Sequence, residues 1–219
     1  GHPFLALELV NGQTLCDAVR AEPQDFRWSA AMIAQLSRAI HYAHQQSVVH
    51  RDLKPGNVLL CRAADAADSD SSLHLWRPPY PLRPGDEETI VPAAKITDFG
   101  LAKQLNSVSG LTETGQAMGT PAYMSPEQAL GNSDRIGPAT DIYALGVMLY
   151  ELISGRVPFK SEDLVSLIRS IIEVDAETPS RFRKSIPTDL ETICLKCLMK
   201  APEDRYASAL DLAIDLELY

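Results

Sequence analysis

The stretch His50-Arg51-Asp52-Leu53-Lys54-Pro55-Gly56-Asn57 decides the fold, because it gathers an imidazole, two bases, an acid and an amide into one short segment. Val48-Val49 precedes it and Val58-Leu59-Leu60 follows it, and short β-branched and apolar runs are typical of strands. Pro55-Gly56 favours a turn, so we expect the polar side chains on a tight loop held at both ends. Such a loop can present chemistry: Asp52 can accept a proton, Lys54 can neutralise a phosphate and Asn57 can ligate a metal.

Two further motifs follow downstream. Asp98-Phe99-Gly100 comes directly after Ala94-Lys95-Ile96-Thr97, and residues 119–127 read Gly-Thr-Pro-Ala-Tyr-Met-Ser-Pro-Glu. Residues 50–57 match the catalytic-loop pattern H-R-D-L-x-x-x-N of protein kinases, Asp98-Phe99-Gly100 matches their D-F-G, and the third stretch resembles the segment that ends in A-P-E, with Ser in place of Ala. The chain therefore resembles the C-terminal lobe of a Ser/Thr protein kinase of the eukaryotic-like, or Hanks, type that also occurs in bacteria.

The resemblance implies an α+β fold that is mostly α-helical: a kinase C-lobe with small β-hairpins at the cleft and with the N-lobe missing. Residues 1–12 would form the last N-lobe strand (Pro3 to Val10) and the hinge, with Asn11-Gly12 turning the chain, and 13–219 would form the C-lobe. Neither G-x-G-x-x-G-x-V nor V-A-I-K occurs in the sequence. We therefore expect the chain by itself to transfer phosphate poorly or not at all, and its first partner to be the N-lobe of the same protein.

The resemblance also assigns catalytic roles, with ATP and Mg²⁺ (or Mn²⁺) as cofactors and protein Ser/Thr hydroxyls as substrates. Asp52 would orient and deprotonate the hydroxyl, Lys54 would stabilise the transferring phosphoryl group, and Asn57 and Asp98 would hold the metal. Around the adenine, the family pattern places Leu7 as the gatekeeper, the backbone of Glu8 and Val10 at the edge, and Leu59 as the floor.

Structural and regulatory roles follow from the same resemblance. A phosphate on Thr112 or Thr114 would be clamped by Arg51. The residues expected to have structural roles are His50, Phe99, Gly100, Thr120, Glu127, Asp141 and Arg205. We expect Phe99 to pack on His50, Gly100 to let the chain turn, and Thr120 to reach towards Asp52 and Lys54. We also expect Asp141 to brace the backbone of the catalytic loop, and Glu127 to form a buried ion pair with Arg205.

Helices are predicted from capping residues and apolar periodicity. They cover 14–21, 29–46, a strongly apolar stretch from Thr140-Asp141 to Gly155, a helix ending near 173, 190–199, and a last helix to the end of the sequence. The expected N-caps are Ser29, Ser161, a Thr188-x-x-Glu191 capping box, and Ser208. The helix from Ser29 would bury one stripe, made of Met32, Leu36, Ala39 and Ala43.

Residues 62–93 form a Pro- and Asp-rich insertion between two segments, 59–61 and 95–97, that we expect to pair as a hairpin. Its composition cannot bury enough apolar surface to offset ordering, and its prolines argue against strand pairing, so we expect it to be disordered. Trp76 and Tyr80 keep a docking role open.

The bulk composition excludes several classes of function. A net charge of −9 and a pI near 5.0 argue against a nucleic-acid surface, and no apolar run is long enough to span a membrane. Four cysteines without a disulfide pattern indicate a reducing, cytoplasmic setting, although the parent protein can carry a membrane anchor outside this chain. Cys194-x-x-Cys197 falls in a helical apolar pattern and is interpreted as core rather than zinc ligands; His41 and His44 are interpreted as packing or surface residues.

Two other interpretations stay open. The lobe can serve as a pseudokinase-like scaffold or binding module, against which the intact Asp52, Lys54, Asn57 and Asp98 argue. It can also belong to a small-molecule phosphotransferase of the aminoglycoside-kinase kind, against which Ser125-Pro126-Glu127 and the long Thr-bearing segment argue.

Overall fold

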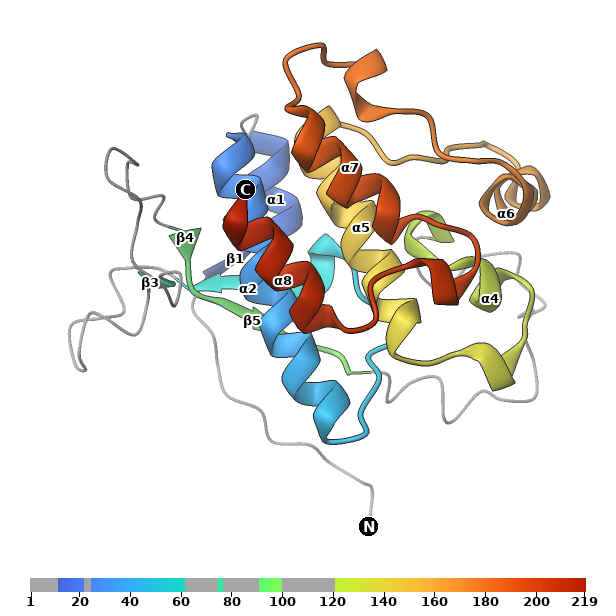
Figure 1. Cartoon of the computed structure of the whole chain (residues 1–219), viewed down its shortest axis with the longest axis horizontal. Helices are drawn as coiled ribbons and strands as arrows, with labels where there is room; N and C mark the ends of the chain where they lie inside the picture. Colours follow the sequence, from blue (N-terminus) through green and yellow to red (C-terminus); the bar gives the residue numbers. More distant parts are fainter. Residues whose placement is uncertain (1–11, 22–24, 62–74, 77–90, 100–120) are drawn as a thin grey trace.

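The structure is a computed structural model that describes residues 12–21, 25–61, 75–76, 91–99 and 121–219. Its helices are α1 (Leu15–Ala21), α2 (Phe26–Gln45), α4 (Pro126–Ala129), α5 (Pro138–Ser154), α6 (Leu164–Glu173), α7 (Thr188–Cys197) and α8 (Ala209–Leu218). Its strands are β1 (Gly12–Thr14), β2 (Val58–Cys61), β3 (Leu75–Trp76), β4 (Val91–Pro92) and β5 (Ala94–Ile96). Short 3-10 turns lie at Pro55–Asn57, Pro121–Tyr123, Ser133–Arg135, Pro179–Arg181 and Pro202–Asp204. The described part is mostly helical with small antiparallel sheets, as predicted (Figure 1).

Helix α5 forms the centre of the molecule and packs against α2, α7 and α8 (Figure 1). Its side chains are buried nearly all round, as the uninterrupted apolar sequence predicts. The helix begins at Pro138 rather than at Thr140, because proline suits a first helical turn. It ends at Gly155, which adopts a left-handed conformation with φ 77°.

The predicted N-cap of α2 is wrong. Asp25 caps the helix, because its carboxylate accepts hydrogen bonds from the backbone N–H groups of Arg27 (2.8 Å) and Trp28 (3.3 Å). Ser29 lies one turn inside the helix and donates its hydroxyl to the Asp25 carbonyl (2.8 Å). Asp and Ser are both good N-caps, and here the earlier one begins the helix.

The predicted buried stripe of α2 is only partly right. Met32 and Leu36 are fully buried, but Ala39 is exposed and Ala43 is half-buried. Because α5 and α8 both pack on α2, the buried face is broad rather than a single stripe. Arg38 joins α2 to α8 through a two-pronged ion pair with Glu217, at 2.5 and 2.6 Å.

Strands β1, β2 and β5 form a three-stranded antiparallel sheet. Leu59 lies opposite Lys95, so the predicted hairpin is present. The prediction of a turn at Asn11-Gly12 is wrong for Gly12, which begins β1 opposite Cys61. A Cβ on Gly12 would lie 2.0 Å from the Leu60 carbonyl oxygen, so only glycine fits this close approach.

Val48-Val49 does not form the predicted strand. The backbone N–H of Val48 instead donates to the carbonyl of Ala43 (2.9 Å), which closes the C-terminal end of α2. Val48 is also 42% exposed, so its β-branched side chain does not mark a buried strand.

Part of the Pro-rich insertion forms a separate two-stranded sheet. Contrary to prediction, β3 and β4 pair, with Leu75 opposite Pro92 and Trp76 opposite Val91. Proline tolerates an edge strand because its missing N–H is not needed there. The side chain of Gln35 on α2 fixes the end of the insertion, since it donates to the Pro92 carbonyl (3.2 Å) and accepts from the Ala94 N–H (2.5 Å). The other residues of this range, 62–74 and 77–90, lie outside the described residues.

The C-terminal helices show which capping predictions hold. Ser208 caps α8 as predicted, because its hydroxyl accepts from the Asp211 N–H (3.2 Å). Asp163, not Ser161, caps α6 by accepting from the Ser166 N–H (2.8 Å). The predicted capping box of α7 is absent: Pro187 is the N-cap, and Glu191 accepts instead from the Ser180 N–H (2.7 Å).

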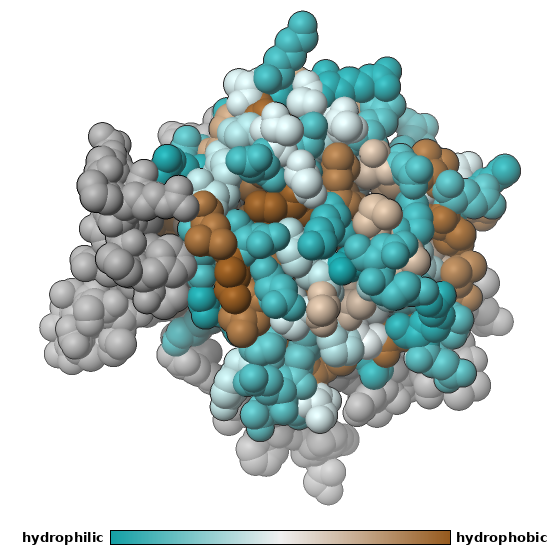
Figure 2. Space-filling view, in the orientation of Figure 1, coloured by the Kyte–Doolittle hydropathy of each residue, from teal (hydrophilic) through white to brown (hydrophobic). Residues whose placement is uncertain are grey.

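The molecule has an apolar interior and a mainly polar surface (Figure 2). Cys194 and Cys197 are fully buried, so their interpretation as core residues is confirmed. The face of the molecule shown in Figure 2 is mainly hydrophilic, with hydrophobic residues in separate patches. Among the described residues, no helix combines the length and the hydropathy needed to cross a bilayer.

Candidate active site

The loop between α2 and β2 gathers the three predicted catalytic side chains. The Lys54 Nζ lies 2.8 Å from Oδ2 of Asp52. The Asn57 amide nitrogen donates to the Asp52 carbonyl (2.8 Å) and to Oδ2 of Asp52 (3.3 Å). Leu53, between these polar residues, is 2% exposed and anchors the loop in the core. The Asp52 side chain is still 41% exposed, so a substrate can reach its carboxylate.

Asp141, near the start of α5, braces the backbone of this loop. Its Oδ2 accepts from the His50 N–H and its Oδ1 from the Arg51 N–H, both at 2.8 Å. The contact expected from the sequence is therefore present. Asp141 is fully buried, and these donors compensate the cost of burying its carboxylate.

His50 connects the loop to the strand that precedes Asp98. Its Nδ1 accepts from the Asp52 N–H (3.2 Å), which assigns the ring hydrogen to Nε2, and Nε2 donates to the Thr97 carbonyl (2.9 Å). The ring of Phe99 packs against it with centroids 4.7 Å apart and planes inclined by 51°. The predicted contact between Phe99 and His50 is present.

Asp98 is held next to Asn57 by backbone pairing. The Thr97 N–H donates to the Asn57 carbonyl (2.9 Å), so Asp98 follows at the end of the β2–β5 ladder. Asp98 and Arg51 both have positive φ, 59° and 67°, a conformation that non-glycine residues adopt at a cost. Strained residues on both sides of one site indicate that its geometry is imposed by the surrounding structure.

The donor set fits a divalent cation such as Mg²⁺. Because the Asn57 nitrogen is used towards Asp52, its amide oxygen is left as an acceptor, and the Asp98 carboxylate supplies hard oxygen ligands. The described residues hold no cluster of three or more His, Cys, Asp or Glu that would form an all-protein metal cage. Mg²⁺ typically binds to one or two protein ligands together with substrate phosphates, so two oxygen donors suffice.

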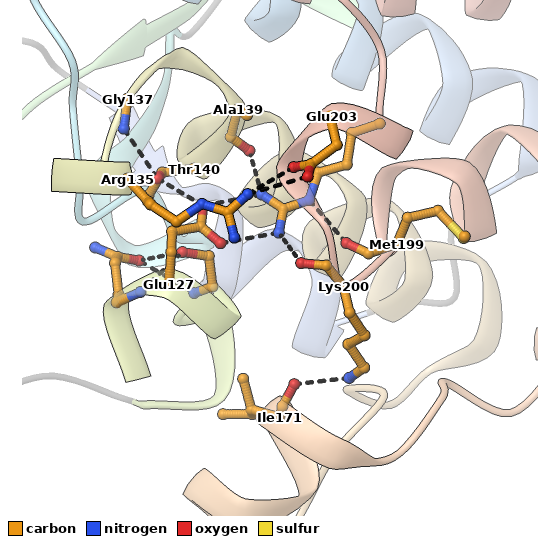
Figure 3. A network of polar contacts seen from close by, with 12 residues as sticks. Glu127, Arg135, Gly137, Ala139, Thr140, Ile171, Met199, Lys200 and Glu203 are labelled. Carbon is orange, nitrogen blue, oxygen red and sulfur yellow. Dashed lines mark hydrogen bonds and ion pairs between the residues drawn. The ribbon is translucent and has the colours of Figure 1, made fainter. Parts of the chain in front are cut away.

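Glu127, in α4, forms the expected buried ion pair with Arg205. Figure 3 shows Glu127 next to Thr140 in the network of polar contacts around this pair. Two parallel hydrogen bonds of 2.9 Å join the guanidinium to the carboxylate, and the Thr140 hydroxyl donates to the same carboxylate (2.8 Å). Burial by itself would raise the pKa of Glu127, but the bonds from Arg205 and Thr140 hold that pKa below its usual value. The pair ties α4 to the segment between α7 and α8.

Of the residues predicted around the adenine, the structure describes only Leu59. Leu59 is half-buried in β2 beside the catalytic loop. Outside the described residues lie Leu7, Glu8, Val10, Gly100, Thr112, Thr114 and Thr120.

Two contacts at the site were not predicted from the sequence. The His44 Nε2 lies 2.8 Å from Oδ2 of Asp141, although His44 was interpreted only as a packing or surface residue. The Gln128 amide donates to the Arg51 carbonyl (2.7 Å). A Ser-x-x-Gln pattern at Ser125 was a signal for a capping box, but it carried no information about Arg51.

Comparison with known proteins agrees with this geometry. The sequence profile of the family described as Protein kinase domain matches residues 1–213. Serine/threonine-protein kinase PknB of Mycobacterium tuberculosis is 32% identical over 216 residues, which cover 98% of this chain and 30% of the relative. Serine/threonine-protein kinase PrkC of Bacillus subtilis is 35% identical over 220 residues, with 98% and 28% covered.

A probable serine/threonine-protein kinase of Clostridium acetobutylicum is 31% identical over 214 residues, with 97% of this chain and 28% of the relative covered. The chain thus spans no more than 30% of the length of these curated relatives. The catalytic-loop cluster, the neighbouring Asp98 and the Glu127–Arg205 pair occur together with a profile match over nearly the whole sequence, and the chain belongs to the protein kinase domain family.

Proposed function

We propose that this chain is the C-terminal lobe of a bacterial serine/threonine protein kinase, which transfers the terminal phosphate of ATP to protein hydroxyls. The observation that carries the proposal is the cluster of Asp52, Lys54 and Asn57, next to Asp98 at the end of the β2–β5 ladder. Phosphoryl transfer needs positioning and charge neutralisation more than covalent chemistry, and this cluster supplies both.

Each side chain has one role in the proposed reaction. Asp52, partly exposed, orients the substrate hydroxyl and takes up its proton. Lys54, 2.8 Å from Asp52, is proposed to neutralise charge on the group being transferred. The Asn57 amide oxygen and the Asp98 carboxylate would hold Mg²⁺, and the ion would neutralise charge on the phosphates.

The proposed substrates are Ser and Thr residues of proteins. The relatives are named serine/threonine-protein kinases, and Lys54 and Gly119-Thr120-Pro121 resemble that class. We also propose that Thr112 or Thr114, once phosphorylated, is held by Arg51, and that the kinase works in the cytoplasm, where ATP is available and cysteines stay reduced.

Activity is proposed to need an N-lobe. Residues 1–12 would then be its last strand and hinge, and Leu7, Glu8, Val10 and Leu59 would enclose the adenine. Because a kinase needs the ion pair of its β3 Lys as well as the metal site, we expect the purified chain by itself to be nearly inactive. The full-length protein that carries this chain, here called the parent kinase, is expected to be active.

The test replaces Asp52 in the parent kinase. We expect Asp52→Asn to lower kcat on a Ser/Thr peptide by about 10²–10⁴-fold, because the proton acceptor is lost, while the KM for MgATP changes little. Steady-state assays with a peptide and with an aminoglycoside as alternative acceptors measure this. Transfer to the aminoglycoside alone would instead identify a small-molecule phosphotransferase. No transfer by the wild-type parent would identify a scaffold, whereas unchanged peptide activity in Asp52→Asn would refute the role of Asp52 as the proton acceptor.

A further inference from the structure

By the resemblance to kinases, residues 98–127 correspond to the activation segment, and Gln128, which directly follows it, contacts the catalytic loop (residues 50–57). Its amide Nε2 donates to the Arg51 carbonyl oxygen at 2.7 Å, across 77 positions of sequence. Its Oε1 accepts from the Ser125 N–H at 3.1 Å. The two contacts fix the amide orientation, because a flipped amide would place donor against donor and acceptor against acceptor.

The carbonyl that Gln128 holds belongs to the peptide unit between Arg51 and Asp52. The N–H of the same peptide unit donates to the His50 ring at 3.2 Å. On the other side of Arg51, its own N–H donates to Asp141 at 2.8 Å. Arg51 has φ 67°, so a residue in an unfavourable backbone conformation is held by hydrogen bonds on both of its peptide groups.

The backbone of Gln128 is also held in place. Gln128 is the third residue of α4, whose N-cap Ser125 is fully buried and accepts from the Gln128 N–H (3.4 Å). Its neighbour Glu127 is tied to Arg205 by the buried ion pair. Helix α4 therefore contacts the interior through Glu127, and it contacts the catalytic loop through Gln128.

We propose that Gln128 is a positioning residue for phosphoryl transfer, which aims Asp52 by holding the peptide group that precedes it. The inference rests on the proposed kinase function for its effect on catalysis. Because the peptide plane between Arg51 and Asp52 sets the direction of the Asp52 side chain, a displacement of α4 is transmitted to the catalytic carboxylate. The position of the C-terminal end of the activation segment is thereby coupled to the orientation of the Asp52 side chain.

The experiment compares two variants that both break the capping box of α4. Gln128→Met keeps the side-chain length but loses the contact with Arg51. Ser125→Ala, the control, removes the hydroxyl but keeps Gln128 oriented, because the Ser125 backbone N–H still donates to Oε1. In the parent kinase, we expect Gln128→Met to lower kcat about tenfold with the KM for MgATP within about twofold of wild type, and Ser125→Ala to retain nearly full kcat.

A second readout does not depend on activity. In the 219-residue chain itself, amide hydrogen exchange at Arg51 and Asp52 is expected to accelerate about tenfold in Gln128→Met and to stay near the wild-type rate in Ser125→Ala. Equal exchange and equal kcat in the two variants would overturn the proposal. Faster exchange in Gln128→Met with an inactive wild-type parent would leave the positioning contact standing and refute the kinase function instead.

Discussion

At the scale of single residues, Arg205 shows how a buried charge is accommodated. Its side chain is fully buried, and its guanidinium bonds to both oxygens of Glu127. Its remaining hydrogen bonds go to backbone carbonyls at 2.8–3.0 Å, those of Ala139, Met199 and Lys200. Because all its donor directions are satisfied, the guanidinium joins three separate segments, and lysine could not reproduce this planar arrangement.

Truncation of Arg205 is expected to destabilise the protein strongly. Arg205→Ala leaves the Glu127 charge buried and unpaired, so we expect a loss of about 3–5 kcal/mol in the free energy of unfolding. Arg135→Ala is the matched control, because its 2.8 Å ion pair with Glu203 is between side chains that are 51% and 65% exposed, and it should cost less than about 1 kcal/mol. Urea unfolding of both variants measures the difference; equal losses would contradict the argument.

The same carboxylate predicts a pH dependence. The pKa of Glu127 is lower in the folded protein than its ordinary value of 4.5, so near that pH the folded state binds fewer protons than the unfolded state. The contribution of the ionised Glu127 to the free energy of unfolding is therefore complete above about pH 4.5, and it is lost as the pH falls through the lowered pKa. Urea unfolding at about pH 6 and about pH 3.5 should show the stability gap between wild type and Glu127→Gln shrinking on acidification. A constant gap would exclude this residue as a source of acid sensitivity.

At the scale of elements, α5 and α7 approach closely at a glycine. A Cβ built on Gly146 of α5 would lie 2.4 Å from the Cβ of Cys197 on α7, and the Cys194 thiol lies 3.6 Å from the Gly146 carbonyl oxygen. The glycine is therefore retained in a helix interior, in spite of its poor helix propensity, because the neighbouring helix occupies the space of a side chain.

Filling that space is expected to push the helices apart. Gly146→Ala should lower the free energy of unfolding by about 1–3 kcal/mol, even though alanine is the better helix former. Gly137→Ala, at the boundary of the same helix, is the control, because nothing lies within 4 Å of an added Cβ there. Thermal unfolding compares the two. A more stable Gly146→Ala would show that the helices separate without cost.

Elements that are defined by strong local chemistry could be predicted from the sequence, whereas elements defined by their neighbours could not. The apolar run of α5 and its stop at Gly155 needed no tertiary information. By contrast, Ser29 and Asp25 are equally good caps, and only the packing of α2 decides between them. Pro92, which pairs with Leu75, accepts a hydrogen bond from Gln35, a residue that is far away in the sequence.

The same distinction holds within the candidate site. The contacts of Asp141 and Arg205 were implied by the resemblance to protein kinases, whose matching residues make them. Those of His44 and Gln128 were not, because a histidine or glutamine on a helix gives no signal of which backbone group lies opposite.

At the scale of the whole molecule, the two ends of the insertion (residues 62–93) meet at the sheet of β1, β2 and β5. The Cys61 N–H donates to the Ala93 carbonyl at 2.9 Å, so the two ends of the segment between them are already joined. Val91 is fully buried, and Gln35 holds the backbone on both sides of Ala93. The geometry of Asn57 and Asp98 therefore depends on the ends of the insertion and not on its length.

Shortening the insertion is expected to be harmless if its end is kept. Replacement of residues 77–89 by a short Gly-containing turn, which keeps both β3 and β4, should change the free energy of unfolding by about 1 kcal/mol or less, because loop-closure entropy varies slowly with length. A longer deletion that also removes Val91 and Pro92 should cost about 1–3 kcal/mol more, since a buried valine is lost. Urea unfolding of the two deletions measures this, and equal stability would show that Val91 anchors nothing.

The attachment of the catalytic loop to Asp141 has a consequence for its motions. The loop is fastened to a helix that has almost no solvent-facing side, so freeing its backbone means breaking bonds to the innermost part of the molecule. Local opening in proteins usually occurs at frayed ends and at surface segments with few buried contacts. The backbone of the loop is therefore expected to open only together with the interior, so that the loop keeps its shape for as long as the fold persists.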